Sequence, residues 1–174
     1  MTILRFENAN GKELGALSWF PVHCTSLSVE NRLISPDNKG FAEYMFETKK
    51  KEAGLSNFVA AFAQGPEGDV TPHLSEPTCP DGKTPCSSDT TCKGKTATCT
   101  AKGPGKDIFE SVRIIGTRQA EFAMKLYNDV KGSTVLRGPI AHRHQFVSPI
   151  DIVPFNSSKL CTPAYGYSFA AGSK

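Results

Sequence analysis

Thr71 is the side chain in this sequence that is best placed to act as a reactive hydroxyl. It lies in the segment Gly68-Asp69-Val70-Thr71-Pro72, shortly after an apolar stretch. Glycine, aspartate, threonine and proline each favour chain reversals, so one interpretation of the segment is a turn and nothing more. The alternative is that the turn presents the Thr71 hydroxyl to a cleft at the end of a sheet. Only the second interpretation gives this hydroxyl a chemical function.

His23 is the second candidate for chemistry. It follows the apolar residues 14–22 and precedes a polar loop at residues 25–35. This position suits a metal ligand or a general base, because imidazole serves in both roles. The alternative is a histidine whose ring bonds to a backbone carbonyl. His142 and His144 would lie on one face of a strand, so they form a further possible pair of metal ligands.

Four cysteines predict cross-links in a segment that has little else to hold it. The segment, about residues 76–105, is rich in Pro, Gly, Ser, Thr and Lys and contains Cys79, Cys86, Cys92 and Cys99. It can bury too little apolar surface to keep a shape without covalent support. A zinc site is the alternative, but these spacings differ from the paired CxxC pattern of zinc ribbons. We therefore predict two disulfides, and the spacing leaves all three connectivities open.

Composition indicates one globular domain with no nucleic-acid partner. The chain has 174 residues, 39% of them hydrophobic, and a net charge of +3 with no basic stripe. No apolar run is long enough to span a membrane. Disulfides and the glycosylation sequon at Asn156 favour a secretory route, yet residues 1–10 lack the apolar core of a signal peptide. We expect an internal segment of a longer protein that is secreted or attached to the cell surface.

Alternating strands and helices predict an α/β domain. Continuous apolar runs predict strands at residues 14–22 and 58–63, and strand-like stretches recur between residues 135 and 155. Helical spacing predicts a first helix that Asp37 or Asn38 caps and that ends before Gly54, and a second over about 107–130. Ligands in open α/β sheets gather at the carboxyl ends of the strands, which is where His23 and Thr71 both fall.

Several motifs together resemble the neutral (non-lysosomal) ceramidase family, in family order and across almost the whole chain. They are residues 18–23 (SWFPVH), 33–40 (LISPDNKG), 58–63 (FVAAFA), 68–72 (GDVTP), 101–105 (AKGPG), 114–116 (IIG), 138–139 (GP), 144–145 (HQ) and 163–172 (PAYGYSFAAG). The resemblance implies the central part of a catalytic domain with a mixed sheet flanked by helices. It also implies first-to-third and second-to-fourth pairing of the four cysteines, and it does not extend to His142.

The resemblance implies an amidase that cleaves ceramide into sphingosine and a fatty acid with the help of one zinc ion. His23 matches one of the two histidine ligands of that zinc. The other histidine lies upstream of this chain, and a glutamate and a tyrosine ligand lie downstream. Thr71 falls on the essential serine of the family, and His73 replaces an asparagine. Zinc would polarise the amide oxygen or acidify a water, while the hydroxyl attacks or positions the substrate.

Two other functions compete with the ceramidase interpretation. One is a ceramidase-like domain that has lost activity and binds only a lipid or a protein, which the changes at Thr71 and His73 motivate. The other is a different lipid amidase on the same scaffold. For the ceramidase, the expected partner is ceramide or another sphingolipid substrate at a membrane surface. A metal histidine encoded upstream and a glutamate and tyrosine encoded downstream would favour the enzyme.

Overall fold

The computed structural model describes residues 1–28, 31–86, 90–95 and 98–148. These residues belong to two units, one formed by Met1–Ser133 and the other beginning at Thr134. The first unit contains all of the helices and strands that the structure assigns. None of the helices among the described residues has the length and the hydrophobicity that crossing a bilayer requires.

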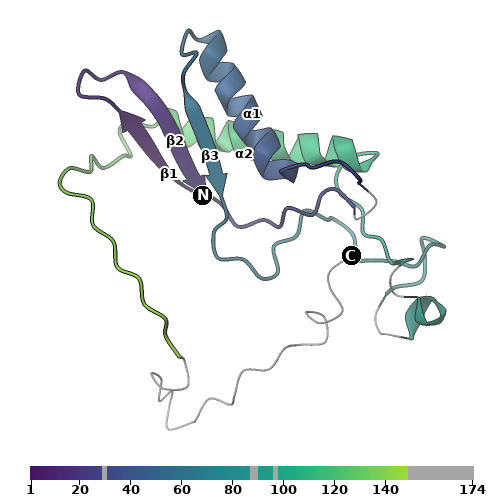
Figure 1. Cartoon of the computed structure of the whole chain (residues 1–174). Helices are drawn as coiled ribbons and strands as arrows, with labels where there is room; N and C mark the ends of the chain where they lie inside the picture. Colours follow the sequence, from purple (N-terminus) through teal and green to yellow (C-terminus); the bar gives the residue numbers. More distant parts are fainter. Residues whose placement is uncertain (29–30, 87–89, 96–97, 149–174) are drawn as a thin grey trace. The chain divides into compact units, whose positions relative to one another are not determined.

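A three-stranded mixed sheet forms the centre of the first unit (Figure 1). Its strands are β1 (Thr2–Glu7), β2 (Glu13–Trp19) and β3 (Val59–Ala63), in the order β1-β2-β3. The first two strands form an antiparallel hairpin, whereas β3 lies parallel to β2 with Trp19 opposite Ala63. Because β2 and β3 are parallel, the chain leaves both strands at the same edge of the sheet. The segments that carry His23 and Thr71 therefore start side by side.

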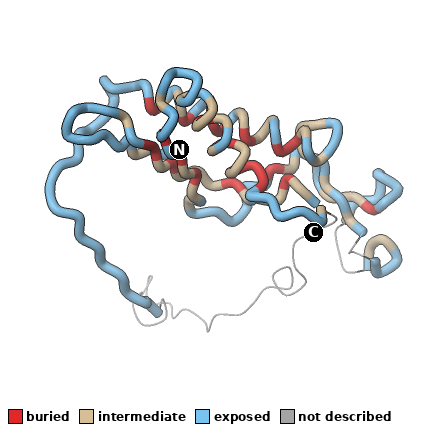
Figure 2. Tube along the Cα trace, turned by 45° about the horizontal axis from the view of Figure 1, so that its top comes forward, coloured by how far each residue is buried: buried red, intermediate tan, exposed pale blue. Residues whose placement is uncertain are grey.

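Two helices, α1 (Asp37–Glu52) and α2 (Ile108–Asn128), pack on the sheet and on each other. The helix α1 contacts β3 and α2 contacts β1, so both cover the face of the sheet that forms the core (Figures 1 and 2). This two-layer arrangement confirms the predicted α/β fold with a mixed sheet. The core combines four aromatic rings with small side chains at the helix contacts: Phe46, Phe58, Phe62, Tyr127, Ala16, Ala42, Ala60, Ala120 and Ala123.

The start of α1 differs from the sequence prediction. Neither Asp37 nor Asn38 caps the helix: Pro36 occupies the cap position without a side-chain hydrogen bond. Asp37 is the first helical residue and has φ of 53°, a left-handed conformation that aspartate tolerates better than most residues. Its carboxylate accepts hydrogen bonds from the backbone N–H of Leu27 at 2.8 Å and of Ser26 at 3.2 Å. These bonds connect the start of α1 to the loop after β2, and the same carboxylate also accepts the backbone N–H of Asn38 at 2.6 Å.

The other helix ends follow the sequence prediction. Gly54 has φ of +90° and donates its N–H to the Lys51 carbonyl at 2.9 Å, which closes α1 as a glycine cap does. Asp107 caps α2, since its side chain accepts the N–H of Glu110 at 2.7 Å.

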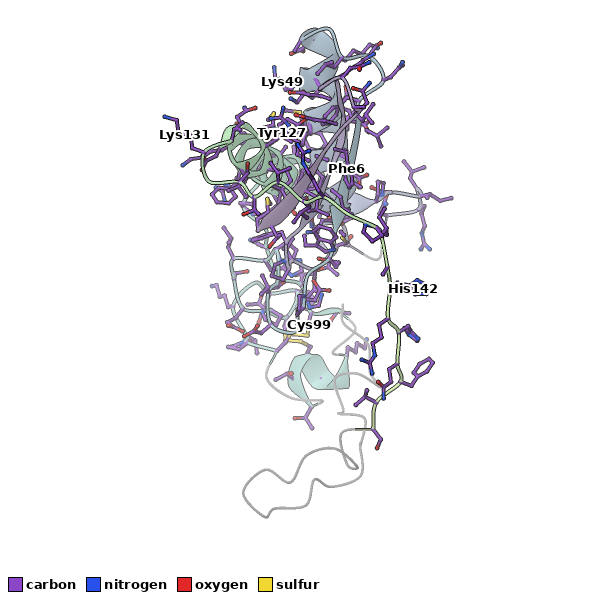
Figure 3. The ribbon with its side chains drawn as sticks, turned by 90° about the vertical axis from the view of Figure 1, so that its left-hand side faces the viewer. Phe6, Lys49, Cys99, Tyr127, Lys131 and His142 are labelled. Atoms are coloured by element: carbon purple, nitrogen blue, oxygen red, sulfur yellow. A yellow bond between two sulfur atoms is a disulfide. The ribbon has the colours of Figure 1, made fainter. Side chains whose placement is uncertain are left out.

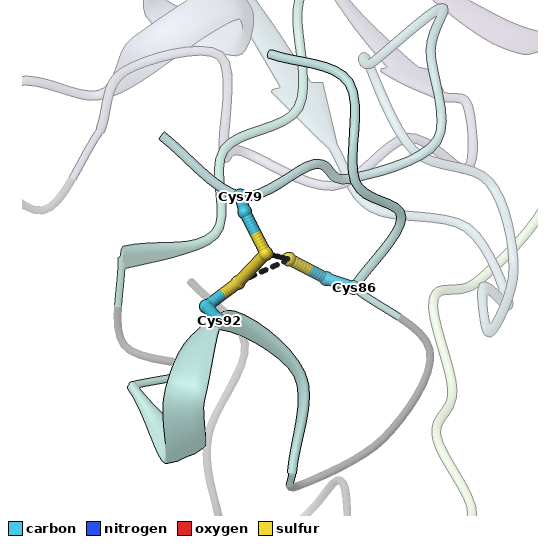
Figure 4. Close-up of side chains that lie close together, drawn as sticks. All are labelled: Cys79, Cys86 and Cys92. Carbon is cyan, nitrogen blue, oxygen red and sulfur yellow. Dashed lines mark hydrogen bonds between the residues drawn. A yellow bond between two sulfur atoms is a disulfide. The ribbon is translucent and has the colours of Figure 1, made fainter. Parts of the chain in front are cut away.

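The cysteine loop contains two disulfides, Cys79–Cys92 (Figure 4) and Cys86–Cys99, of which Figure 3 labels Cys99. This is the pairing that the family resemblance implies. The sulfur atoms of Cys79, Cys86 and Cys92 form the only cluster of three potential metal ligands among the described residues. Because all three sulfurs are in disulfides, the cluster has no thiolate to offer zinc. A short 3-10 helix, Thr91–Gly94, lies inside the loop.

The described part of the second unit, residues 134–148, contains no strand, so the strand-like stretches predicted there are wrong over that range. Its large apolar side chains are exposed, with Ile140 fully accessible. His142 (Figure 3) and His144 are exposed as well, and the His144 ring packs edge-on against Phe146 with 5.0 Å between the ring centroids. A strand needs a partner strand for its backbone hydrogen bonds, and a sequence pattern does not supply one. The predicted stretch at residues 149–155 lies outside the described residues.

Candidate functional site

His23 lies four residues beyond β2, where the chain still runs beside the segment that leaves β3. Phe20 donates its N–H to the Ala63 carbonyl at 3.3 Å, and His23 donates its N–H to the Val70 carbonyl at 3.0 Å. The parallel pairing of β2 and β3 is thus continued by single hydrogen bonds after both strands end. As a consequence, His23 is fixed to the residue that directly precedes Thr71.

Both ring nitrogens of His23 face oxygen atoms of the turn before Thr71. The Nδ1 atom lies 2.9 Å from a carboxylate oxygen of Glu67, and Nε2 lies 3.2 Å from the carbonyl oxygen of Gly68. A neutral imidazole carries one N–H and can satisfy only one of these oxygens. The carboxylate at Nδ1 is the arrangement that commonly orients a metal-binding histidine through its second nitrogen. The ring is 38% exposed, so solvent reaches it.

Asn38, a fully buried residue at the start of α1, holds the backbone around His23. Its amide nitrogen donates to the His23 carbonyl and to the hydroxyl of Ser26, both at 3.0 Å. Its amide oxygen accepts a hydrogen bond from Gln119 of α2, also at 3.0 Å. One side chain therefore connects both helices to the segment that carries His23.

Lys39 and Gln64 hold the same segment from two other directions. The Lys39 ammonium donates to the Phe20 carbonyl at 2.5 Å, and burial lowers the pKa of this amine. The Gln64 side chain pairs with both backbone groups of Val22, accepting from its N–H at 3.3 Å and donating to its carbonyl at 2.5 Å. The backbone on either side of His23 is therefore fixed by side chains from α1 and from the end of β3.

Thr71 forms a pair with His73, two residues further along the turn. The Thr71 Oγ1 atom lies 3.1 Å from Nδ1 of the His73 ring, and the His73 backbone N–H donates to the same oxygen at 3.3 Å. Pro72 between them is fully buried, and its ring fixes the backbone φ angle. Thr71 is an exposed residue, so a substrate can approach its side chain.

An open pocket of about 350 Å³ lies against the Thr71–His73 pair. Its other lining residues include Leu74, Glu76 and Ala101. This volume is within the range of roughly 300–1,000 Å³ that small-molecule sites occupy. The pocket therefore places a hydroxyl, an imidazole and apolar surface next to one another.

The base of the disulfide loop forms the wall of this pocket. Leu74 donates its N–H to the Lys102 carbonyl at 2.8 Å, and Lys102 donates its N–H to the Ser75 hydroxyl at 2.9 Å. Thr78 and Thr100 exchange two backbone hydrogen bonds further along, at 3.0 and 2.9 Å. The two strand-like ends of the loop thus run side by side from the disulfides back to the pocket.

The structure brings together two of the residues that the sequence singled out, and it adds partners that the sequence did not reveal. His23 and Thr71 lie in neighbouring backbone segments, but their side chains point to different partners. Glu67, His73 and Asn38 were missed as site residues. The sequence carries a signal for His73, which lies two residues after Thr71. A threonine hydroxyl commonly accepts a hydrogen bond from the backbone N–H two residues later, and this brings the side chain of that later residue near the hydroxyl. The contacts of Glu67 and Asn38 depend on the tertiary fold.

Other sequence predictions remain untested. Asn156, the candidate glycosylation site, and Cys161 lie outside the described residues, as does the motif at residues 163–172. Cys24 is exposed and is the only free cysteine in the described part of the chain.

The fold and site define an α/β domain with polar groups at the carboxyl ends of two parallel strands. The model of the family described as "Neutral/alkaline non-lysosomal ceramidase, N-terminal" matches residues 1–174. The chain therefore belongs to the neutral/alkaline non-lysosomal ceramidase family.

Curated relatives and a solved structure match the same region. Neutral ceramidase B of Dictyostelium discoideum is 45% identical over 185 residues, which is 99% of this chain and 25% of that protein. The neutral ceramidase of Drosophila melanogaster is 37% identical over 191 residues, 99% of this chain and 27% of that protein. The structure "Ceramidase complexed with C2" shares 38% sequence identity and a TM-score of 0.50 over 71% of this chain and 15% of that chain. The chain thus spans about a quarter of the length of these relatives.

Proposed function

We propose that this chain is the central segment of the catalytic domain of a zinc-dependent amide hydrolase that cleaves ceramide. The products would be sphingosine and a free fatty acid, and the reaction would belong to sphingolipid metabolism. The observation that carries the proposal is the family match over the full 174 residues. The relatives that match are named neutral ceramidases, and ceramide hydrolysis is carried over from those names to this chain.

His23 is the residue of this chain that would hold the metal. Its Nδ1 contact with Glu67 makes Nε2 the nitrogen that would bind a cation, and the Gly68 carbonyl oxygen, 3.2 Å from Nε2, would have to turn away to admit it. The remaining ligands would come from outside this chain, as the family resemblance implies. Zinc bound there would supply a Lewis acid for the amide oxygen or for a water.

Thr71 is the residue that would act on the substrate. Its hydroxyl is exposed at the rim of a pocket and is held by a short turn, which limits the positions it can take. The β-branched side chain stiffens the rotamer further. A hydroxyl fixed in this way can attack or position an amide carbonyl with little loss of conformational freedom.

The substrate and the cellular route follow from the same proposal. Ceramide would be met at a membrane surface, and the segment would belong to a secreted or cell-surface protein. The two disulfides support this route, because such bonds persist mainly in oxidising compartments.

Replacement of Thr71 in the full-length protein that carries this segment tests the proposal. Thr71→Ala should lower the rate of ceramide turnover by about a thousandfold or more, as expected when an attacking group is lost. Thr71→Ser should keep or raise activity, because it retains the hydroxyl and removes the methyl. Rates are measured with a fluorescent ceramide and normalised to folded protein by circular dichroism and to zinc by elemental analysis.

The alternative function, a lipid- or protein-binding domain without activity, predicts a different result. The unmodified protein would then bind ceramide-containing vesicles but release no fatty acid, and neither Thr71 variant would change binding. If Thr71→Ala turns over ceramide at the normal rate, the Thr71 hydroxyl has no catalytic role and the segment is only a structural turn.

A further inference from the structure

We propose that His73 is the general base that activates Thr71. The inference rests on the proposed function, because it assigns the partner of the hydroxyl in the same amide hydrolysis. It goes beyond that function by naming a basic side chain at a position where the family resemblance has an asparagine. An asparagine amide can form hydrogen bonds but cannot take up a proton at neutral pH.

The geometry around Thr71 Oγ1 is that of an activated nucleophile. The hydroxyl has one proton to donate, and the nearest acceptor recorded for it is His73 Nδ1 at 3.1 Å. This distance lies within the reach expected of a nucleophile and its base. The His73 backbone N–H donates to the same oxygen at 3.3 Å, where it would stabilise negative charge that develops on Oγ1.

The surrounding structure keeps the two side chains together. The residue between them, Pro72, is fully buried and has a fixed φ angle. The residue after the pair, Leu74, is anchored by its backbone N–H to the Lys102 carbonyl at 2.8 Å. The His73 ring is therefore attached to backbone that is held on both sides, and its separation from Oγ1 does not depend on a long flexible side chain.

The pocket beside the pair gives the reaction a place to occur. Both Thr71 and His73 line it, so an amide carbonyl that enters the pocket meets the hydroxyl and the imidazole together. Leu74 and Ala101 provide apolar wall next to them, which suits the first methylene groups of an acyl chain.

The reaction that this geometry supports is a two-step acyl transfer. In the first step His73 Nδ1 takes the hydroxyl proton while Thr71 Oγ1 forms a bond to the amide carbon. The carbon–nitrogen bond then breaks, the proton passes to the leaving nitrogen, and the amine departs, leaving an ester on Thr71. In the second step a water molecule gives a proton to His73 and attacks the ester, the Thr71 oxygen recovers that proton, and the fatty acid is released.

A double-mutant cycle in the full-length protein tests the assignment. His73→Ala should lower kcat by about a hundredfold or more, as expected when a general base is removed. His73→Asn and His73→Gln keep a hydrogen-bonding group without a base and should lose a similar factor. The Thr71→Ala/His73→Ala double variant should be no slower than Thr71→Ala alone, because the two residues act as a unit.

Rescue by added imidazole separates a base from a residue that merely supports the turn. Imidazole in solution should restore the His73→Ala rate by about tenfold or more and should leave Thr71→Ala unchanged. If His73→Ala fails to fold, His73→Asn and His73→Gln carry the test, with circular dichroism as the check.

The outcomes distinguish this inference from the proposed function. A His73→Asn variant within twofold of the normal rate, in a protein that Thr71→Ala inactivates, would overturn the role of His73 and leave the ceramidase proposal standing. A protein that shows no ceramide hydrolysis before any substitution would overturn the proposed function itself, and the assignment of His73 with it.

Discussion

Cys24, directly after His23, illustrates how the surroundings of a single residue set its chemistry. The residue is exposed, and its sulfur lies 3.7 Å from the Gln64 amide nitrogen. Partial burial raises the pKa of the thiol, and the nearby carboxylate of Asp37 raises it further. Less of the side chain is therefore thiolate at neutral pH than in an unfolded chain, so the thiol is a poor nucleophile despite its exposure.

Alkylation of Cys24 should reflect this raised pKa. In a chain with Cys161→Ser, so that Cys24 is the only free thiol, we expect the pH midpoint of the iodoacetamide rate to be higher for folded protein than in urea. Since the folded pKa exceeds the unfolded one, the associated stability is present below the unfolded pKa and is lost as the pH rises through the folded pKa. A folded midpoint at or below the value in urea would contradict the expectation. Cys24→Ala, which removes the labelling, should leave full-length activity intact.

Individual residues were only partly predictable from the sequence. His23 and Thr71 were identified because each follows an apolar run, which is a local property of the chain. Their partners were not, since Glu67 is 44 positions from His23 and the contact exists only because β2 and β3 are parallel. The main partners of Asp37 were not predicted for the same reason: besides the N–H of Asn38, its carboxylate binds a loop ten positions earlier.

At the scale of the elements, the contact between α1 and α2 depends on a glycine. A Cβ atom at Gly116 of α2 would lie 2.8 Å from the Asn38 carbonyl oxygen and 2.9 Å from two atoms of the Phe41 side chain. Backbone and a ring cannot both move away cheaply, because Asn38 is held by hydrogen bonds to His23 and Gln119. The glycine therefore allows the two helices to approach closely enough for Asn38 to reach both partners.

Gly116→Ala should consequently destabilise the protein, although alanine is the better helix former. Helix propensity favours alanine by about 1 kcal/mol. Overpacking at the crossing costs about 1–3 kcal/mol, so we expect a net loss of up to about 2 kcal/mol in the free energy of unfolding. Urea denaturation measures the change, and Arg118→Ala, at an exposed position of the same helix, is the matched control. Increased stability in Gly116→Ala would show that the crossing has room for a methyl group.

Elements with a strong local signal were predicted to within a few residues. Both helices follow from the helical spacing of apolar residues, and the strands β2 and β3 from continuous apolar runs. Gly54 marks the end of α1 as its conformation requires. The strand-like stretch after residue 134 failed because strand formation depends on a neighbour. Residues 134–148 contain strand-like apolar stretches, but in the structure they form no backbone hydrogen bonds to a neighbouring strand.

On the scale of the whole molecule, the described residues would supply only part of the proposed metal site. A catalytic zinc site usually has three protein ligands, and His23 is the single ligand that the family resemblance assigns to this chain. The one cluster of three potential ligands in the described regions consists of disulfide sulfurs, which cannot contribute. The chain also matches only about a quarter of the relatives' length.

The isolated chain should therefore bind zinc weakly and hydrolyse no ceramide. One imidazole, even when a carboxylate orients it, lacks the additional ligands that make zinc binding strong. Isothermal titration calorimetry measures the affinity, and His23→Ala is the matched control: it should remove whatever weak binding the site provides. Release of fatty acid from a fluorescent ceramide, with and without zinc, measures turnover. Zinc-dependent hydrolysis by the isolated chain, lost in His23→Ala, would mean that this chain supplies a complete site through residues other than those assigned here.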